Sequence, residues 1–289
     1  MDCVLVLIAA PGSGAIGGKL VERLRAHGAV SPRWLADGEA LEVADFAGRE
    51  AFMAAIADHP VDANIVPAAN RKKRLLIADM DSTMIEQECI DELGVMAGIG
   101  DHIKQITARA MRGELDFEGA LTERVKLLKG LPASIIDDIL RERISFMPGG
   151  RTLIATMKAN GAYAALVSGG FTPFTSSVAA ALGFDENQAN ELVVADGVLT
   201  GEVGHPILGQ QAKLEALQRI CARRSISTAD ALAVGDGAND LAMLGEAGMG
   251  VALHAKPQVQ AEARFRVNHG DLTALLYLQG YARREFVLA

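Results

Sequence analysis

Three short apolar runs constrain the fold of this chain more than any other feature of its sequence. They are Leu75–Ala78, Ala162–Val167 and Ala231–Val234, and each ends in small polar or acidic residues that lead into a helical pattern. Continuous apolar runs of this kind are typical of strands that helices cover on both faces. The sequence therefore predicts an α/β fold on a parallel sheet, with its chemistry at the carboxyl ends of the strands.

The segments around these strands predict three structural parts. Residues 71–83 and 148–289 contain the runs and form the predicted sheet core. Residues 84–147 have helical periodicity throughout, so we expect them to form a helical cap inserted after the first strand of that core. Residues 1–70 follow the order βαββαβ, which predicts a small ferredoxin-like domain.

The individual elements are predicted from periodicity and turn signals. In the N-terminal part they are Cys3–Ile8, Ile16–Ala26, Trp34–Leu35, Ala40–Val43, Phe46–Asp58 and Ala63–Val66. In the cap they are the helices Ile90–Met96, Ile103–Met111, Phe117–Leu128 and Ser134–Ile144. In the core, Leu192–Ala195 and Val198–Val203 flank Asp196-Gly197 as a hairpin, and a helix covers Gln211–Arg223.

Charge and composition exclude several classes of function. Lysine and arginine number 28 against 36 acidic residues, a net charge of −8, whereas a nucleic-acid-binding protein needs a basic surface. Basic residues cluster only at Arg71–Arg74, which we expect to be a solvated linker. No apolar run is long enough to span a bilayer, and Asp2 argues against a signal peptide. Three widely spaced cysteines are typical of a reducing cytoplasm, so we expect a cytoplasmic protein.

Two acidic clusters follow predicted strands. Asp79 and Asp81 come directly after the first run, and Asp236, Asn239 and Asp240 follow the third. Carboxylates crowded at one sheet edge repel one another unless a cation neutralises them. Oxygen ligands without histidine or cysteine favour a hard metal, best Mg²⁺.

Two further elements complete the predicted site. Ser168-Gly169-Gly170 ends the second run, where a hydroxyl and glycine amides before a helix can hold a phosphate group, although such a triplet is more often an ordinary turn. Lys213 lies near the start of an amphipathic helix, where a lysine is usually solvent-exposed. Lys213 is predicted as a site residue only because of the other three elements, which are the two acidic clusters and Ser168-Gly169-Gly170.

Together these segments resemble the four ordered motifs of the haloacid-dehalogenase (HAD) superfamily. Glu88, Phe117–Leu121, Arg124–Leu131, Met147–Gly150 and Val167–Phe171 extend the resemblance to its phosphoserine phosphatases. The resemblance covers about Lys73 to the C-terminus and implies a HAD-like core with a helical cap. The βαββαβ part is similar to the regulatory, ACT-like domains that precede this kind of enzyme.

The resemblance implies Mg²⁺-dependent hydrolysis of O-phospho-serine, the last step of serine biosynthesis. Asp79 is the implied nucleophile, Asp81 the general acid and base, and Lys213 the cation that neutralises nucleophile and phosphate. The implied metal ligands are Asp79, the backbone carbonyl of Asp81, and Asp236, with Asp240 outside them. The implied substrate contacts are Ser168, Gly169 and Asn239 to phosphate, Glu88 to the ammonium, Arg124 to the carboxylate, and Met111 and Phe117 as an apolar wall.

Other functions are weighed against this one. A HAD phosphatase for another small phosphomonoester fits the same motifs, whereas a non-catalytic amino-acid sensor would not need both Asp79 and Asp81. Met111 and Phe117 could equally pack the interior of the cap. Gly12–Gly17 fits a dinucleotide-binding pattern, but too little chain follows it for a dinucleotide fold. An amino-acid ligand at the N-terminal domain and a homodimer stay open.

Overall fold

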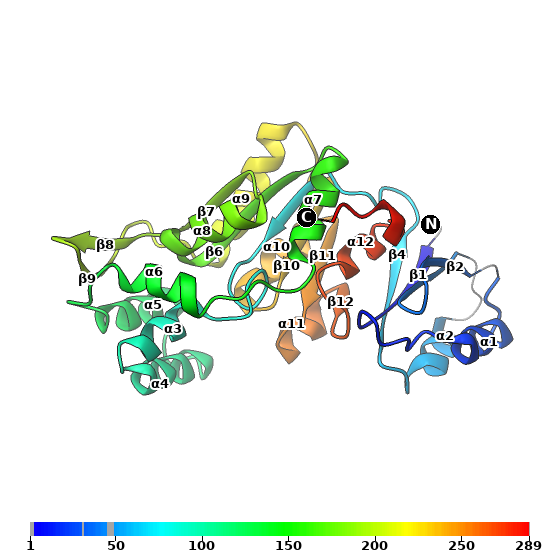
Figure 1. Cartoon of the computed structure of the whole chain (residues 1–289), viewed down its shortest axis with the longest axis horizontal. Helices are drawn as coiled ribbons and strands as arrows, with labels where there is room; N and C mark the ends of the chain where they lie inside the picture. Colours follow the sequence, from blue (N-terminus) through cyan, green and yellow to red (C-terminus); the bar gives the residue numbers. More distant parts are fainter. Residues whose placement is uncertain (1–2, 31, 45–48, 289) are drawn as a thin grey trace.

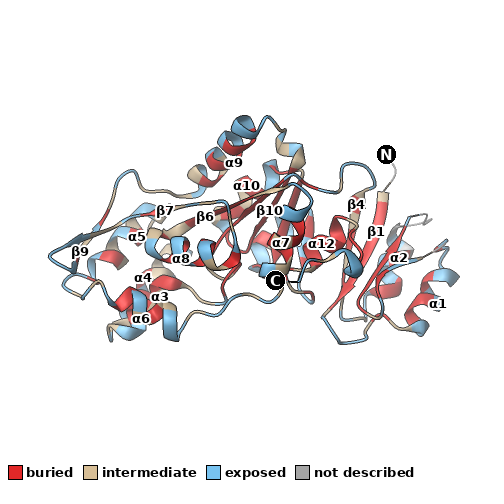
Figure 2. Cartoon of the chain, turned by 45° about the horizontal axis from the view of Figure 1, so that its top comes forward, coloured by how far each residue is buried: buried red, intermediate tan, exposed pale blue. Residues whose placement is uncertain are grey.

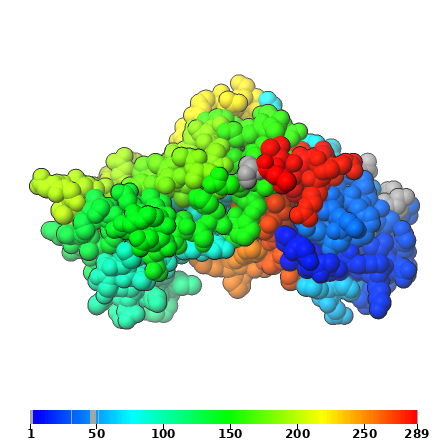
Figure 3. All heavy atoms as spheres, viewed as in Figure 1, coloured from blue at the N-terminus to red at the C-terminus, as the bar shows by residue number. Residues whose placement is uncertain are grey.

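The chain forms an elongated molecule in which a sheet-based core lies between a helical cap and a small N-terminal domain (Figure 1; Figure 3). The computed structural model describes residues 3–30, 32–44 and 49–288. Within these residues the core strands are β5 (Leu75–Ala78), β6 (Tyr163–Phe171), β7 (Glu186–Asn190), β10 (Ala231–Gly235), β11 (Met249–Leu253) and β12 (Phe265–Val267). Their order is β12-β11-β10-β5-β6-β7 and every neighbouring pair is parallel, which confirms the predicted α/β sheet.

Helices cover both faces of this sheet. On one face lie α7 (Gly150–Ala159), α8 (Thr172–Leu182) and α12 (Ala274–Leu278), and on the other α9 (Gln210–Arg224), α10 (Leu241–Glu246) and α11 (Pro257–Glu262). Short 3-10 turns are η1 (Thr228–Asp230), η2 (Ala238–Asp240) and η3 (Arg283–Glu285). Leu76 and Ala78 pack on the first face and Leu75 and Ile77 on the second, because successive side chains of a strand point to opposite faces. The central strands are therefore buried along their length (Figure 2).

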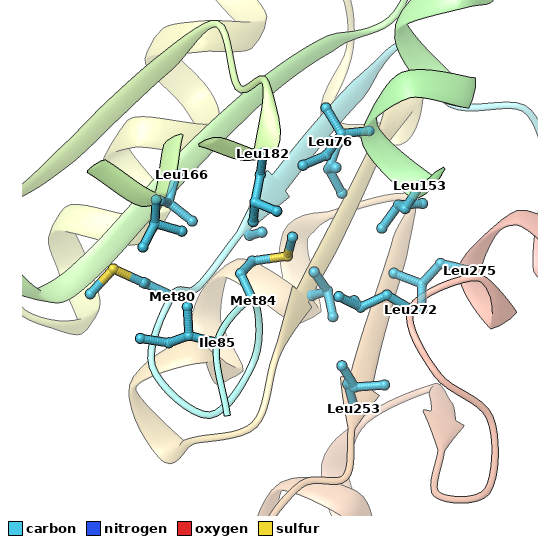
Figure 4. Packing of buried hydrophobic residues seen from close by; sticks show 14 of the residues in the cluster. Leu76, Met80, Met84, Ile85, Leu153, Leu166, Leu182, Leu253, Leu272 and Leu275 are labelled. Atoms are coloured by element: carbon cyan, nitrogen blue, oxygen red, sulfur yellow. The ribbon is translucent and has the colours of Figure 1, made fainter. Parts of the chain in front are cut away.

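The segment that follows β5 is anchored in the hydrophobic core. Met80, Met84 and Ile85 are fully buried there, among leucines of the sheet and its covering helices (Figure 4). Burying each such side chain contributes about 1.5–3 kcal/mol. The acidic residues on either side of Met80 are consequently held at the carboxyl edge of the sheet.

The core differs from its prediction in two respects. Strand β6 does not end at Ser168 but continues to Phe171, with a shift of register against β7 between Val167 and Phe171. Strands β7, β11 and β12 were not predicted. The residues of β7 are mostly polar, because this strand lies at the edge of the sheet, so its sequence lacks the apolar pattern that identifies the central strands.

The N-terminal domain has the ferredoxin-like arrangement that was predicted. Its elements are β1 (Cys3–Ala9), α1 (Gly18–Ala26), β2 (Arg33–Ala36), β3 (Ala40–Val43), α2 (Arg49–Ile56) and β4 (Val61–Pro67). The sheet order is β2-β3-β1-β4 and all its pairs are antiparallel. The first helix begins two residues later than expected, after a loop in which Gly12 and Gly14 have positive φ angles. Residues 46–48 of the second predicted helix lie outside the described residues.

One face of the N-terminal sheet packs on the core. Its apolar side chains share a hydrophobic cluster with α12, and Glu39 accepts hydrogen bonds from the Tyr277 hydroxyl (2.8 Å) and from Arg283 (2.6 Å). The expectation of a solvated linker at Arg71–Arg74 is wrong for two of its residues. Arg71 donates to Glu42 (3.0 Å), and Lys73, only 8% exposed, donates to the carbonyl oxygens of residues 70 and 229. Arg71 connects the two domains, because it also donates to the carbonyls of residues 278 (3.2 Å) and 277 (3.4 Å) in the core, whereas Lys73 joins the linker to the core.

Asp62 provides a further contact between the domains and a prediction about stability. It is 5% exposed, and its carboxylate accepts the backbone N–H groups of Asn268, His269 and Gly270 at 2.7–2.9 Å. We expect Asp62→Ala to lower the free energy of unfolding by about 2–4 kcal/mol, because three backbone donors, that of Gly270 buried, lose their acceptor. Chemical denaturation measures this, with the exposed Asp58→Ala as the control. Equal losses of unfolding free energy in Asp62→Ala and Asp58→Ala would contradict a stabilising contact of Asp62 between the domains.

The cap consists of helices between β5 and α7, as predicted. They are α3 (Cys89–Met96), α4 (Gly100–Met111), α5 (Phe117–Lys126) and α6 (Ile135–Glu142). The two chain crossings into the cap lie side by side, because Ile85 and Phe146 form an antiparallel bridge. Among the described residues, no helix combines the length and the apolar character needed to cross a bilayer.

A hairpin from the core makes a second connection to the cap. It consists of β8 (Leu192–Ala195) and β9 (Val198–Val203), and its turn at Asp196-Gly197 has positive φ at both residues, as predicted for this dipeptide. Backbone N–H groups of Gly130 and Leu199 donate to the carbonyls of Leu199 and Leu131, respectively, at 2.8 Å. The hairpin and the cap are therefore joined by backbone hydrogen bonds.

Candidate active site

Two strands and one helix bring the central charged groups together. Asp79 follows β5, Asp236 follows β10, and Lys213 lies in the first turn of α9. The backbone N–H of Asp79 donates to the Val234 carbonyl, which extends the pairing of the two strands into the site. The Lys213 ammonium lies 2.8 Å from Asp79 and 2.6 Å from Asp240, and all three groups are buried. The lysine that sequence patterns alone would place in solvent therefore lies inside the site.

The site carries more negative charge than Lys213 can balance. Burial and the charge of Asp240 hold the pKa of Asp79 well above its usual range, although Lys213 opposes this. Burial, again with Asp240, raises the pKa of Asp236 to about 6. Burial alone would lower the pKa of Lys213, but Asp240 and Asp79 outweigh it and raise that pKa. One ammonium among three buried carboxylates leaves a net negative site that a cation would stabilise.

The donor set fits a hard divalent metal ion. Carboxylate oxygens of Asp79, Asp236 and Asp240 lie within 4.8 Å of one another, and these three ligands offer oxygen only. Both oxygens of Asp240 are occupied, since Oδ1 accepts from Lys213 and Oδ2 from the N–H groups of Asp236 and Gly237. This leaves Asp79 and Asp236 as the better placed ligands.

Asp81 lies beside a second acid on the cap side of the site. Its Oδ1 accepts the Cys89 N–H at 3.0 Å, while the Ser82 hydroxyl donates to Glu88 at 2.8 Å. Burial, helped by the negative charge of Glu88 and opposed by the Cys89 N–H, raises the pKa of Asp81 to about 7. A carboxyl group with such a pKa can give and take a proton near neutral pH. A Cβ at Gly170 would lie 2.8 Å from the other Asp81 oxygen, so a glycine is needed there.

A cavity of about 700 Å³ joins the core and cap residues of the predicted site. All the predicted site residues line it except Lys213 and Asp240, which lie buried behind it. Arg124 faces the cavity from α5, held by a hydrogen bond from its Nε to the Ala120 carbonyl (3.1 Å), and burial lowers its pKa. Met111 lines the cavity yet is 76% exposed, so it does not serve as packing inside the cap.

The Ser168-Gly169-Gly170 triplet, which was predicted to hold phosphate, has a defined geometry. The Ser168 hydroxyl oxygen accepts the Gly170 N–H at 2.8 Å. A Cβ at Gly169 would lie 3.0 Å from the ring of Phe117, so the cap can approach the core this closely only over a glycine. Phe117 therefore contacts the core directly, rather than only other cap residues.

Several residues of the site were not predicted. Thr83 donates to Asp236 at 3.0 Å, and Gln210, Lys256 and Gln258 line the cavity. The apolar run of β11 was a usable signal for Lys256, because β11 pairs in parallel with β10 and its carboxyl end must reach the same edge. Thr83 belongs to the first motif, Asp79–Thr83, which was a signal for it, but no role was assigned to this threonine.

Comparison with known proteins agrees with this geometry. The sequence model of the haloacid dehalogenase-like hydrolases matches residues 76–245. A phosphoserine phosphatase of Streptomyces coelicolor is 45% identical over 78% of this chain and 55% of its own length. This chain spans between about half and two thirds of the length of the first such relatives.

Solved structures extend the likeness to the fold. The unliganded structure of a probable phosphoserine phosphatase from Vibrio cholerae has a TM-score of 0.81 at 30% identity, covering 98% of this chain and 88% of that one. A phosphoserine phosphatase complex with bound substrate has a TM-score of 0.67 at 39% identity, over 71% of this chain and 98% of that one.

The fold, the ordered motifs and these matches define the class of the protein: the chain belongs to the haloacid dehalogenase-like hydrolase family. Within this family, the relatives that it matches over core and cap are phosphoserine phosphatases.

Proposed function

We propose that this protein hydrolyses O-phospho-serine to serine and phosphate through a phosphoaspartate on Asp79. The observation that carries the proposal is one cavity that joins Asp79 and Asp81 of the core to Glu88 and Arg124. The core pair supplies the chemistry of a phosphatase, and the other two offer one charge of each sign for the amino-acid part of the substrate. The phosphoserine phosphatases that the chain resembles support this choice of substrate.

The proposed reaction has two covalent steps. A carboxylate oxygen of Asp79 attacks phosphorus, the bond from phosphorus to the serine oxygen breaks, and Asp81 protonates the departing oxygen. Asp81 then takes a proton from a water molecule, which attacks phosphorus and releases phosphate while Asp79 is regenerated. Lys213 stabilises the negative charge near Asp79 in both steps. Ser168, the Gly169 amide and Asn239 are proposed to hold the phosphate oxygens.

Mg²⁺ is the proposed metal. Asp79, the backbone carbonyl of Asp81, and Asp236 would hold it, with Asp240 fixing the Asp236 turn. When bound, it supplies positive charge that offsets repulsion between the nucleophile and a phosphate dianion.

Removal of divalent metal tests whether a cation is needed to offset the negative charge of the site. We expect EDTA to reduce phosphate release from phosphoserine by at least about 1,000-fold, because the repulsion in the site is then unscreened. Added Mg²⁺ should restore the activity, and added Ca²⁺ should restore much less, since Ca²⁺ prefers a larger set of oxygen ligands. Full activity in EDTA would contradict a metal role.

Arg124 is the proposed partner of the substrate carboxylate, because a guanidinium binds a carboxylate through two parallel hydrogen bonds. Arg124→Ala should raise KM for phosphoserine about 30-fold or more, and for 4-nitrophenyl phosphate less than about 3-fold. Arg109→Ala is the matched control, since that arginine lies in the cap and pairs with Glu123. Equal effects of Arg124→Ala on both substrates would remove Arg124 from substrate recognition.

Phosphate release from a panel of phosphate monoesters, with phosphoserine among them, tests the substrate. The highest kcat/KM for phosphoserine is the expected result. A preference for an ester without an amino-acid group would favour the alternative of another small phosphomonoester, and no release at all would favour the amino-acid sensor. An amino-acid ligand of the ACT-like N-terminal domain and a homodimer stay predictions, as does a cytoplasmic location.

A further inference from the structure

Asn190 is a buried polar residue that the mechanism above does not use. It is the last residue of β7 and is 1% exposed. Its Nδ2 donates to the carbonyls of Gly169 (2.8 Å) and Leu208 (3.2 Å), and its Oδ1 accepts the Leu208 N–H (2.6 Å). Only this orientation of the amide fits, because the two carbonyls can only accept and the N–H can only donate. Its side chain therefore connects two segments that border the site.

The first connection sets the direction of a donor in the cavity. The Gly169 carbonyl and the Gly170 N–H belong to one planar trans peptide, so they point in opposite directions. While Asn190 holds the carbonyl, the N–H on the other side donates to the Ser168 hydroxyl oxygen at 2.8 Å. The Ser168 oxygen is the acceptor of that bond, and among the described residues no acceptor bonds to the Ser168 hydroxyl hydrogen, so this hydrogen can point to an anion in the cavity that Ser168 lines.

The second connection reaches the helix that carries Lys213. Leu208 precedes Gly209, which is the N-cap of α9, and Lys213 lies in the first turn of that helix. A Cβ at Gly169 or at Gly209 would lie 3.0 or 3.2 Å from the Phe117 ring, so the ring rests on both glycines. Asn190 thus connects the Ser168–Gly170 segment with the start of α9, and these two segments carry the glycines on which Phe117 of the cap rests.

We propose that Asn190 is a positioning residue for phosphate binding, which acts by fixing the Gly169–Gly170 peptide and through it the Ser168 hydroxyl. The proposal rests on the proposed function only in that a phosphate group occupies the cavity; it does not depend on which ester carries that group. Its effect must therefore be the same for all phosphate substrates, in contrast to that of Arg124.

Asn190→Asp tests this proposal. The carboxylate can still accept the Leu208 N–H, but in place of the NH2 donor it has an oxygen that faces the carbonyls of Gly169 and Leu208. We expect kcat/KM to fall about 100-fold for both phosphoserine and 4-nitrophenyl phosphate, as on loss of one aligned donor. Binding of inorganic phosphate, measured by calorimetry, should weaken about 10-fold. Asn187→Asp is the matched control: Asn187 lies on the same strand, and its Oδ1 accepts from Thr175, away from the cavity. Losses no larger than those of the control, or a loss confined to phosphoserine, would overturn the proposal.

A double-mutant cycle separates positioning from a general effect on folding. If Asn190 acts through Ser168, Asn190→Asp should cost less than about 10-fold when Ser168→Ala is already present, against about 100-fold alone. Equal costs in both backgrounds would overturn the proposal. Asn190→Ser, smaller and uncharged, replaces the aspartate variant in the cycle if thermal unfolding shows that the latter is not folded.

The same experiments keep the two proposals apart. If the wild-type protein cleaves the aryl phosphate but not phosphoserine, the proposed substrate fails while Asn190 is still tested on the aryl phosphate. If it cleaves phosphoserine and Asn190→Asp behaves like the control, only the role of Asn190 fails.

Discussion

Asp79→Asn is expected to abolish phosphoenzyme formation and to lower kcat by about 10,000-fold or more, because an amide oxygen cannot replace the attacking carboxylate. Acid quenching followed by mass spectrometry of the intact chain detects the phosphoaspartate in the wild-type protein. The same change should raise the melting temperature in metal-free buffer. Burial and Asp240 raise the pKa of Asp79, so its charged form is unfavourable in the folded state, and a neutral amide removes that cost.

Phosphoenzyme formation and melting temperature, measured together, distinguish a nucleophile from a residue needed for folding. Asp196→Asn makes the same chemical change in the exposed turn of the β8–β9 hairpin and should alter neither kcat nor phosphoenzyme formation. Phosphoenzyme in the Asp79→Asn protein would remove Asp79 as the nucleophile. A lower melting temperature than that of the wild type would show that the crowded charges do not destabilise the metal-free fold.

Asp81→Asn should separate the two steps of the reaction. Serine is a poor leaving group, so kcat for phosphoserine should fall about 1,000-fold when its oxygen is no longer protonated. An aryl phosphate has a leaving group that needs little protonation, so its first step should be much less affected. Because the variant also lacks the base for the second step, phosphoenzyme should accumulate on Asp79 with the aryl substrate.

A rapid-quench time course measures this accumulation. A burst of nitrophenol equal to about one per enzyme, followed by slow turnover, is the expected pattern. Glu86→Gln, an exposed acid in the same loop region, is the control and should show no burst beyond that of the wild type. Equal loss of activity on both substrates, with no accumulated phosphoenzyme, would contradict the assignment of Asp81 as acid and base.

The core and the main charged groups could be predicted because the carboxyl ends of the strands in a parallel sheet lie at the same edge. Leu75–Ala78 and Ala231–Val234 are apolar enough to identify as strands, and the acids that follow them necessarily reach one edge. The cap helices were predicted from periodicity within a few residues of their ends. Lys213 needed the family resemblance, since nothing in its own helix pattern distinguishes a buried lysine from an exposed one.

The remaining features depend on contacts between distant segments. Glu186–Asn190 pairs only at one side as an edge strand, so its polar sequence gives no strand signal. Arg71 and Lys73 look like a solvated charge run until the N-terminal domain and the core place acceptors around them. Asn190 is one of seven asparagines, and its importance lies in carbonyls of residues 169 and 208 that only the folded chain brings to it.

The two connections of the cap have a mechanical consequence. The paired chain crossings at Ile85 and Phe146 connect the cap to the core at one point. The backbone hydrogen bond from Leu199 of the hairpin to Leu131 of the cap connects it at a second point. A rigid body held at two points keeps a single degree of freedom, which is rotation about the line through them. We expect the cap to move as one body about these two connections, so that Met111 and Arg124 approach or leave the core side of the cavity together.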